Sequence, residues 1–360
     1  MTQDELSELD ATLDAGERAA ESAVFPEPED ARHTADGVPG SLAWAAGRLR
    51  GRPTVGVCVT ARDEGPLVLD TVLSLLHAGV DQIVVVDDAS EDGCCDPSRL
   101  PAQVDLVRHN RPVGVSRSRQ AGFDCLWTDV LATCDGHVIA PEGSAFRDAA
   151  AASKDAEAMV CASSKPMAHS DWVARGGSLK MSTKCWAMLV PLDASGRRES
   201  RYKRCSGLFG SVYMAPRSVW RRINGFVPND LYGYNEQTLA MQCYFSGVPI
   251  VWDGVLVCSH WLKPKVARPI FKDTIFRNAT DAHYALFSSQ WFQEWWRPGI
   301  LRRHKGLKGW SPTPELDAWR ERFLAGRAKT DEEFFLDIVA PGVPHEEFFP
   351  SRKRDSGGRL

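Results

Sequence analysis

The sequence lacks any long hydrophobic run, and this absence excludes a membrane-spanning helix. None of its apolar stretches approaches the ~20 residues that a helix needs to cross a bilayer. The stretch Met1–Glu5 is acidic and has neither the basic nor the apolar region of a secretory signal peptide. A net charge of −4 argues against a dedicated nucleic-acid-binding protein. We therefore expect a cytoplasmic protein with no membrane span and no nucleic-acid partner.

Zinc-ribbon spacing and a compact disulfide pattern are also missing, although the chain has ten cysteines. Only Cys94 and Cys95 are adjacent, and most of the others lie within apolar runs. This distribution is typical of reduced, buried thiols in a cytoplasmic protein. Internal repeats are absent as well, which excludes a solenoid or a propeller.

From residue 52 onward, short apolar runs alternate with helical patterns. The expected elements are a strand at 54–60, a helix at 67–76, and strands at 82–86 and 104–108. Near-continuous apolar runs separated by a helix favour an α/β fold with a parallel sheet covered on both faces. A Gly-x-Gly-x-x-Gly turn does not follow the first strand, and its absence disfavours a nicotinamide-dependent enzyme.

Polar residues follow the first two predicted strands at their carboxyl ends. They are Thr60 and Arg62 after the first strand, and Asp87 and Asp88 after the second. Because ligands of open parallel sheets bind at this edge, these four side chains are candidates for a binding site.

Two arginines, Arg117 and Arg119, lie near the start of a helix predicted from residue 115. A helix start flanked by guanidinium groups favours an anion such as a diphosphate. The alternative is a pair of solvated surface arginines, and this segment alone does not decide between the two.

The segment Thr133–Ala140 carries an Asp-x-His pattern at Asp135 and His137. If the segment is extended, the two side chains point the same way, because side chains alternate with period two along a strand. A carboxylate beside an imidazole suits Mn²⁺ or a similar ion that holds a diphosphate. The alternative is an ordinary polar strand end.

The order of these motifs resembles a known family. The sequences at 57–64 (Val-Cys-Val-Thr-Ala-Arg-Asp-Glu), 84–90 (Val-Val-Val-Asp-Asp-Ala-Ser), 114–122 (Gly-Val-Ser-Arg-Ser-Arg-Gln-Ala-Gly) and 134–137 (Cys-Asp-Gly-His) are similar to the nucleotide-binding half of family 2-like glycosyltransferases with the GT-A fold. The Asp-x-His pattern most resembles the polypeptide N-acetylgalactosaminyltransferases. The resemblance covers roughly residues 52–262.

This resemblance implies a UDP-sugar donor and a divalent metal, Mn²⁺ or Mg²⁺. By analogy, Thr60, Arg62 and Asp88 meet the uridine, with Asp87 alongside and Glu64 in the same donor-binding set. Arg117 or Arg119 steadies the phosphates. Asp135 and His137 hold the metal.

The resemblance continues in the second half of the chain. The segment Lys203–Met214 is similar to a small-residue stretch in which a glycine, here Gly207, lets the sugar approach the backbone. A strand with a bulge at Gly207 or Gly210 is the alternative. The motif Cys258-Ser259-His260 resembles the segment that supplies a third metal ligand, which we expect to be His260.

The pair Glu236-Gln237 resembles an acceptor-facing Gly-Glu-Asp or Gly-Glu-Asn element and makes both residues catalytic candidates. An amide cannot take a proton, so Glu236 is the better candidate for the base that activates the acceptor hydroxyl. Alternatively, the enzyme retains the sugar's configuration and needs no such base.

We expect four segments: a flexible or helical lead-in at 1–51, the GT-A domain at 52–265, a helical C-terminal extension at 266–345 and a disordered tail at 346–360. The loop Lys263–Pro269 is expected to close over the donor. The aromatic residues Trp291, Phe292, Trp295 and Trp296 either pack on the core or form an acceptor platform.

Two classes of function remain after this reading. The first is a metal-dependent hexosyl- or N-acetylhexosaminyltransferase whose acceptor is a natural product, a peptide or a glycan. The second is a non-catalytic GT-A-like protein that binds a nucleotide or a carbohydrate. A nucleotidyltransferase is a weaker third reading, because the segment Arg62–Gly65 is a poor match to the Gly-rich basic signature of that class.

Overall fold

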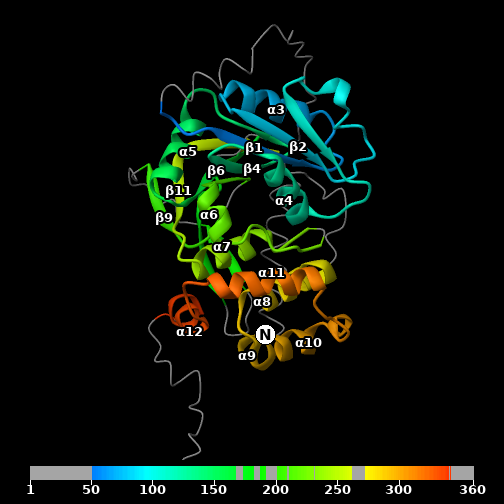
Figure 1. Cartoon of the computed structure of the whole chain (residues 1–360), viewed down its shortest axis with the longest axis vertical. Helices are drawn as coiled ribbons and strands as arrows, with labels where there is room; N and C mark the ends of the chain where they lie inside the picture. Colours follow the sequence, from blue (N-terminus) through cyan, green and yellow to red (C-terminus); the bar gives the residue numbers. More distant parts are fainter. Residues whose placement is uncertain are drawn as a thin grey trace, which may run out of the picture.

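Parallel strands form the first half of a central sheet in the computed structural model (Figure 1). The structure describes residues 51–167, 173–181, 187–191, 201–208, 211–230, 232–261, 272–339 and 341. Four strands lie side by side and parallel, in the order β3 (Val104–Arg108), β2 (Gln82–Asp87), β1 (Val55–Ala61) and β4 (Val130–Asp135). All of β2 is buried, as expected for a strand with both faces covered. The predicted parallel α/β sheet is confirmed.

Helices α3 (Leu67–His77) and α4 (Val115–Cys125) cover opposite faces of these strands. Val85 belongs to the hydrophobic cluster that contains Leu75 of α3, whereas Val84 belongs to the cluster that contains Phe123 of α4. Neighbouring residues of a strand point to opposite faces, so one apolar run supplies both clusters. A short 3-10 turn, η1 (Pro97–Arg99), precedes β3.

The second half of the sheet is mixed. Strand β10 (Val212–Pro216) is antiparallel to both β4 and β6 (Met159–Pro166), and β11 (Ile250–His260) is parallel to β6. Strands β5 (Val138–Ile139) and β9 (Tyr202–Cys205) are antiparallel to β11. A separate two-stranded sheet pairs β7 (Gly177–Met181) with β8 (Ala187–Pro191). The remaining helices of this half are α5 (Ala145–Asp155), α6 (Arg217–Arg222) and α7 (Asn235–Phe245).

Two apolar runs, residues 248–252 and 255–261, follow α7 in the sequence. One continuous strand, β11, covers both runs, and its register with β6 shifts between Trp252 and Val257. The reason is Asp253, which is fully buried and whose carboxylate accepts hydrogen bonds from the backbone N–H groups of Val255 and Leu256. Because this carboxylate satisfies the irregular backbone, the chain bulges and does not turn.

The C-terminal part is helical and lies together at one end of the molecule, below the sheet in Figure 1. Its elements are α8 (Lys272–Leu286), α9 (Ser289–Trp291), the π-helix η2 (Phe292–Trp296), α10 (Arg297–Arg303), the 3-10 turn η3 (Lys305–Leu307), α11 (Pro314–Gly326), α12 (Asp331–Phe334) and the π-helix η4 (Phe335–Val339). Trp291, Phe292 and Trp296 are buried in the core, which supports the packing interpretation for these rings.

None of the helices within the described ranges combines the length and the apolar character needed to cross a membrane. Several predictions concern residues outside those ranges: the lead-in up to residue 50, the loop expected to close over the donor, the alternative bulge at Gly210 and the C-terminal tail.

Candidate metal and donor site

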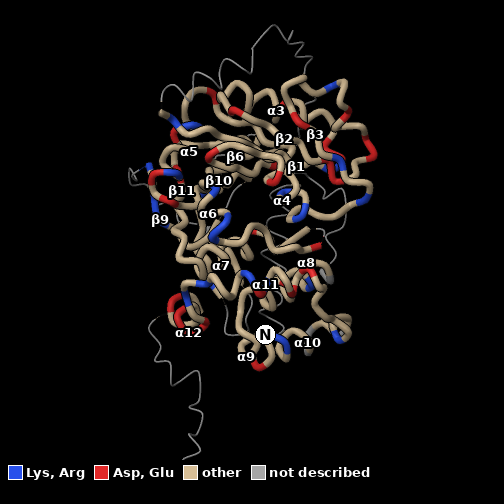
Figure 2. The backbone as a smooth tube through the Cα atoms, in the orientation of Figure 1, with Lys and Arg blue, Asp and Glu red and all other residues tan. Residues whose placement is uncertain are grey.

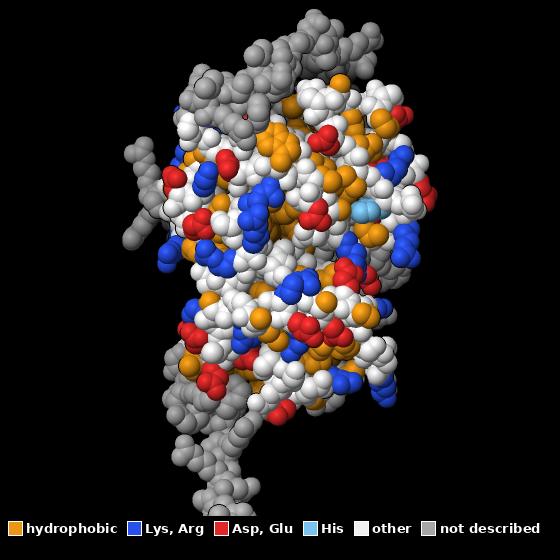
Figure 3. Space-filling view, viewed as in Figure 1, with side chains coloured by type: hydrophobic (Ala, Val, Ile, Leu, Met, Phe, Trp, Pro, Cys, Tyr) orange, Lys and Arg blue, Asp and Glu red, His pale blue; other side chains and the backbone are white. Residues whose placement is uncertain are grey.

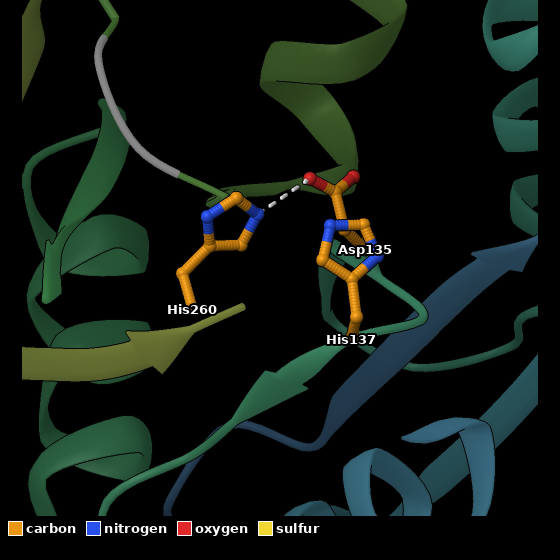
Figure 4. Close-up of side chains that lie close together, drawn as sticks. All are labelled: Asp135, His137 and His260. Atoms are coloured by element: carbon orange, nitrogen blue, oxygen red, sulfur yellow. Dashed lines mark ion pairs between the residues drawn. The ribbon is translucent and has the colours of Figure 1, made fainter. Parts of the chain in front are cut away.

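Three side chains converge at the carboxyl edge of the sheet: Asp135, His137 and His260 (Figure 4). Each offers one ligand atom, and these atoms all lie within 4.8 Å of one another. The Asp135 Oδ2 and His260 Nε2 atoms are 3.7 Å apart, and the two imidazole ring centroids are separated by 4.8 Å. All three residues are half-buried. The structure therefore brings together the three residues predicted as metal ligands.

The strand register explains this convergence. Strand β4 ends at Asp135, His137 lies in the following turn, and β5 then pairs Val138 with His260 of β11. The two ligands of the Asp-x-His pattern thus meet around a turn, and not along the extended segment that the sequence suggested.

Gly136 allows this turn to pack closely against β1. Its N–H donates to the Thr60 carbonyl oxygen at 2.9 Å, and a Cβ at this position would lie 3.0 Å from the same oxygen. Any larger residue would push the turn away from β1 and separate the two ligands that it joins.

Glu64 orients the His137 ring through its Nδ1 atom. Its Oε2 atom lies 2.9 Å from His137 Nδ1, and Glu64 is buried. A carboxylate on one ring nitrogen fixes the imidazole orientation and leaves the other nitrogen, Nε2, for a metal. The sequence placed Glu64 among the donor contacts, and this geometry instead indicates a supporting contact to a metal ligand.

Arg119 fixes Asp135 from the opposite side. The guanidinium is buried, and its Nη2 donates to Asp135 Oδ1 at 3.0 Å. Burial alone would raise the pKa of Asp135, but His260, Arg119 and His137 together hold it well below its usual range. Asp135 is therefore an ionised oxygen donor throughout the neutral range.

Arg117 does not share this position. It donates to the Pro228 carbonyl oxygen and pairs with Glu315 of α11. Residues two apart on a helix do not share a face, so α4 directs Arg119 toward Asp135 and Arg117 toward the C-terminal helices. The structure thus separates two arginines that the sequence treated as equivalent.

The candidate base Glu236 opens helix α7, and its Oε1 accepts a hydrogen bond from the Tyr213 hydroxyl at 3.0 Å. The Arg119 guanidinium carbon lies 5.7 Å from the centroid of the Tyr213 ring. A continuous chain of contacts therefore runs from Asp135 through Arg119 and Tyr213 to Glu236. The adjacent Gln237 differs, because its buried Oε1 has no hydrogen-bond partner among the described residues.

Tyr213 is the residue of this group that the sequence reading missed. It lies on β10, opposite Thr133 of β4, which is two residues before Asp135. No local motif marks it, because the pairing of β10 with β4 joins segments that lie far apart in the sequence.

The two aspartates after β2 are engaged within the protein. Asp87 accepts from the Arg108 Nε at 2.7 Å, and Asp88 accepts from the backbone N–H groups of Val113 and Gly114 at 2.7 and 3.1 Å. Asp88 therefore fixes the loop that leads into α4.

Thr60 and Arg62 lie half-buried at the end of β1, and the Arg62 Nε is buried without a hydrogen-bond partner in the described chain. Thr60 lies directly opposite Asp135 in the register of β1 and β4. Both residues thus remain available at the same sheet edge as the three candidate ligands.

Gly207 packs closely against the neighbouring backbone. It exchanges hydrogen bonds with Gly177, and a Cβ at residue 207 would lie 2.7 Å from Leu189 Cδ2. This packing gives the glycine a structural reason that the sequence did not reveal, and the close approach of a sugar here stays a prediction.

The donor set fits a divalent metal. One carboxylate oxygen and two imidazole nitrogens suit Mn²⁺ and related ions, and the buried His260 Nε2 has no hydrogen-bond partner in the described part of the chain. An unpartnered buried imidazole nitrogen beside a carboxylate is what a metal ligand requires.

Residues 56–180 match the family model described as Glycosyl transferase family 2. This part of the chain is similar to a glycosyltransferase family 2 domain. A search of curated protein sequences finds no match to the chain.

Solved structures agree on the fold. A crystal structure of GalNAc-T7 with UDP, GalNAc and Mn²⁺ has a TM-score of 0.60 and 16% sequence identity, and the alignment covers 80% of this chain and 57% of that chain. The chain thus spans a little over half the length of that neighbour. The predicted GT-A fold with helices in the C-terminal part is confirmed.

Two further structures are similar over a comparable range. The mannosyltransferase PcManGT from Pyrobaculum calidifontis, in complex with GDP-Man and Mn²⁺, is 13% identical with a TM-score of 0.42, covering 79% of this chain and 92% of that one. S. aureus TarS residues 1–349 with UDP-GlcNAc is 13% identical with a TM-score of 0.43, covering 79% and 84%. The family match and the GT-A fold together support a glycosyltransferase.

Proposed function

We propose that this chain is a metal-dependent glycosyltransferase that moves a hexosyl or N-acetylhexosaminyl group from a UDP-sugar to an acceptor hydroxyl. The observation that carries the proposal is the cluster of Asp135, His137 and His260, at the sheet edge where ligands of such folds bind. The choice of metal and nucleotide is supported by the Mn²⁺ and UDP in the GalNAc-T7 structure.

The three ligands would hold Mn²⁺ or Mg²⁺, which supplies positive charge to the diphosphate leaving group when bound. Glu64 fixes the His137 ring for this purpose, and Arg119 keeps Asp135 ionised and in place. Thr60 and Arg62 face the nucleoside portion in this proposal, Asp87 lies alongside and is held by Arg108, and Asp88 shapes the adjoining loop.

Glu236 is the group we assign to the acceptor. It lies in the first turn of α7, and the Tyr213 hydroxyl orients its carboxylate. A general base in this position takes the acceptor proton as the hydroxyl attacks the anomeric carbon, and the product then has inverted configuration. The acceptor itself is a natural product, a peptide or a glycan.

Calorimetry with UDP tests the donor and the metal together. We expect tight binding of UDP in Mn²⁺, weaker binding after chelation with EDTA, and little binding of GDP or NAD. Incubation of the protein with UDP-sugars and Mn²⁺, without an acceptor, should release UDP slowly by hydrolysis. Metal-dependent UDP binding without any hydrolysis or transfer would instead favour the non-catalytic binding protein. Equal UDP affinity with and without metal would contradict the metal site.

A further inference from the structure

A second cavity lies on the other side of α4 from the metal site. It has a volume of about 650 Å³ and is enclosed by the outward face of α4, helix α6, the following loop and helix α11. Figure 2 shows basic positions on α4, α6 and α11. Figure 3 shows basic side chains around recessed hydrophobic ones on this face of the molecule.

Helix α4 separates the two sites. Arg117 lines the cavity, whereas Arg119 points to Asp135 and does not line it. Ser116 also lines the cavity, and its hydroxyl donates to the Asn235 side chain at the start of α7. This contact joins α4 to α7 between the two sites. The cavity is therefore distinct from the donor site and not an extension of it.

The charge of the lining is positive. Four arginines and two carboxylates line the cavity: Arg117, Arg217, Arg221, Arg322, Asp124 and Glu315. Arg117 pairs with Glu315, and the Arg217 Nη2 donates to the carbonyl oxygens of Leu126 and Thr128 at 2.7 and 3.1 Å. The guanidinium groups of Arg221 and Arg322 form no hydrogen bond or ion pair with any residue that the structure describes. Two guanidinium groups therefore remain available for an anion.

The floor of the cavity is aromatic. The rings of Phe123, Trp220 and Phe226 pack against one another with centroids 4.7 to 5.3 Å apart, and Trp319 adds a fourth ring. These residues are 3–7% exposed, and the small exposed parts that line the cavity form an apolar base beneath a basic rim.

Trp319 supplies a second indication of a ligand. Trp319 is only 4% exposed, and its Nε1 is buried without a hydrogen-bond partner in the described chain. The neighbouring Trp220 shows the usual arrangement, because its Nε1 donates to the Leu131 carbonyl oxygen at 3.0 Å. A buried donor without an acceptor is destabilising, and an acceptor atom on a ligand would satisfy it.

We propose that this cavity binds an aromatic anion, a molecule with an apolar ring system and a carboxylate, sulfonate or phosphate group. The ring system packs on Phe123, Trp220 and Phe226, the anionic group pairs with Arg221 and Arg322, and Trp319 Nε1 donates to an acceptor atom. This site goes beyond sugar transfer and does not depend on the metal or the donor.

A pair of fluorescent probes tests the proposal on the full chain. Anilinonaphthalene sulfonate has an aromatic system with one negative charge, and phenylnaphthylamine has the same rings without the charge. We expect saturable binding of the sulfonate at one site, with at least about tenfold lower affinity in the double variant Arg221→Gln and Arg322→Gln. Affinity for the uncharged probe should stay within about twofold, because the apolar floor is intact.

The adjacent Arg222 provides a matched control. It pairs with Glu157 at 3.1 Å and does not line the cavity, so Arg222→Gln should leave sulfonate binding unchanged. Trp319→Phe keeps the ring and removes the N–H, and should weaken sulfonate binding several-fold. Thermal melting of each variant verifies folding, and UDP binding in Mn²⁺ should be unaltered.

Three results would overturn the proposal. They are unchanged sulfonate affinity in the double variant, an equal loss in Arg222→Gln, and binding that does not saturate at one site. Failure of UDP binding in the wild-type chain would count against the proposed glycosyltransferase alone, because the probe titration needs neither metal nor donor.

Discussion

Histidines in two regions of this molecule show how a residue's surroundings decide its chemistry. At the sheet edge, His137 and His260 are half-buried beside Asp135, with Glu64 on His137 Nδ1. In the C-terminal helices, His283 is fully buried between the stacked rings of Phe287 and Trp296, whose centroids lie 5.3 and 4.6 Å away.

The physical consequence differs between these regions. The Nδ1 of His283 lies 2.7 Å from the Ala279 carbonyl oxygen and so donates to it, and burial lowers the pKa of His283 to about 3. His283 is therefore a neutral part of an aromatic core. The sheet edge instead keeps charged and unpartnered polar atoms close together, which is the arrangement that binds a ligand.

The largest effect should come from the aromatic layer. Trp296 is 2% exposed, so Trp296→Ala removes a large buried ring and should lower the free energy of unfolding by about 3–5 kcal/mol. Chemical denaturation measures this change. Because the aromatic layer is separate from the candidate metal site, the folded variant should bind Mn²⁺ as tightly as the wild type does. This is measured at a temperature where the variant is folded. A loss of metal affinity equal to that of a ligand variant would break the comparison.

Glu236→Gln should instead lower the rate of transfer without lowering stability. General-base loss lowers the transfer rate about a hundredfold, which corresponds to about 2.7 kcal/mol, while donor affinity and stability hold. Initial rates measure the loss, and NMR of the product should show inverted anomeric configuration. Substantial residual turnover, or retained configuration, would remove Glu236 from the base role and indicate a front-face mechanism.

His137→Ala should weaken UDP binding in Mn²⁺ by about tenfold or more and leave binding in EDTA little changed. Calorimetry in the two buffers measures both values. His283→Phe is the matched control, because it replaces a histidine that packs among aromatic rings and bonds to the helix backbone, away from the candidate metal ligands. A metal-dependent loss in the control would show that histidine content, and not position, sets the affinity.

The smallest effect concerns Asp281, which lies on α8. Burial raises its pKa to about 6, although the Trp310 Nε1 donates to its Oδ1 at 2.7 Å. Because folding favours the protonated carboxyl, this contribution to stability is present below about pH 4 and is lost as the pH rises through about 6.

Asp281→Asn keeps the hydrogen-bond acceptor and removes the titration. The difference in unfolding free energy between variant and wild type should then grow by about 1 kcal/mol per pH unit across this window. Denaturation between about pH 4 and about pH 8 measures the slope. A pH-independent difference would show that Asp281 is solvated like a surface carboxylate.

The sequence by itself determined the strands and helices of the first half. The Val-rich runs at β1 and β2 predicted buried parallel strands, and their observed ends lie within one residue of the predicted ones. The pair Asn224-Gly225 is typical of a helix end and follows α6, and both residues adopt positive φ of 63° and 66°. Such features depend on local hydrophobic periodicity and turn chemistry, which a single segment carries.

Tertiary structure alone decided which residues meet. The pairing of β5 with β11 brings His260 to Asp135 across more than a hundred residues of sequence, and the pairing of β10 with β4 adds Tyr213. The helical phase of α4 sends Arg119 to the metal site and Arg117 to the second cavity. Strand pairing and helix packing are non-local, and a distance between side chains exists only after the whole sheet has formed. For that reason the candidate metal ligands could be predicted from the sequence, while their supporting contacts could not.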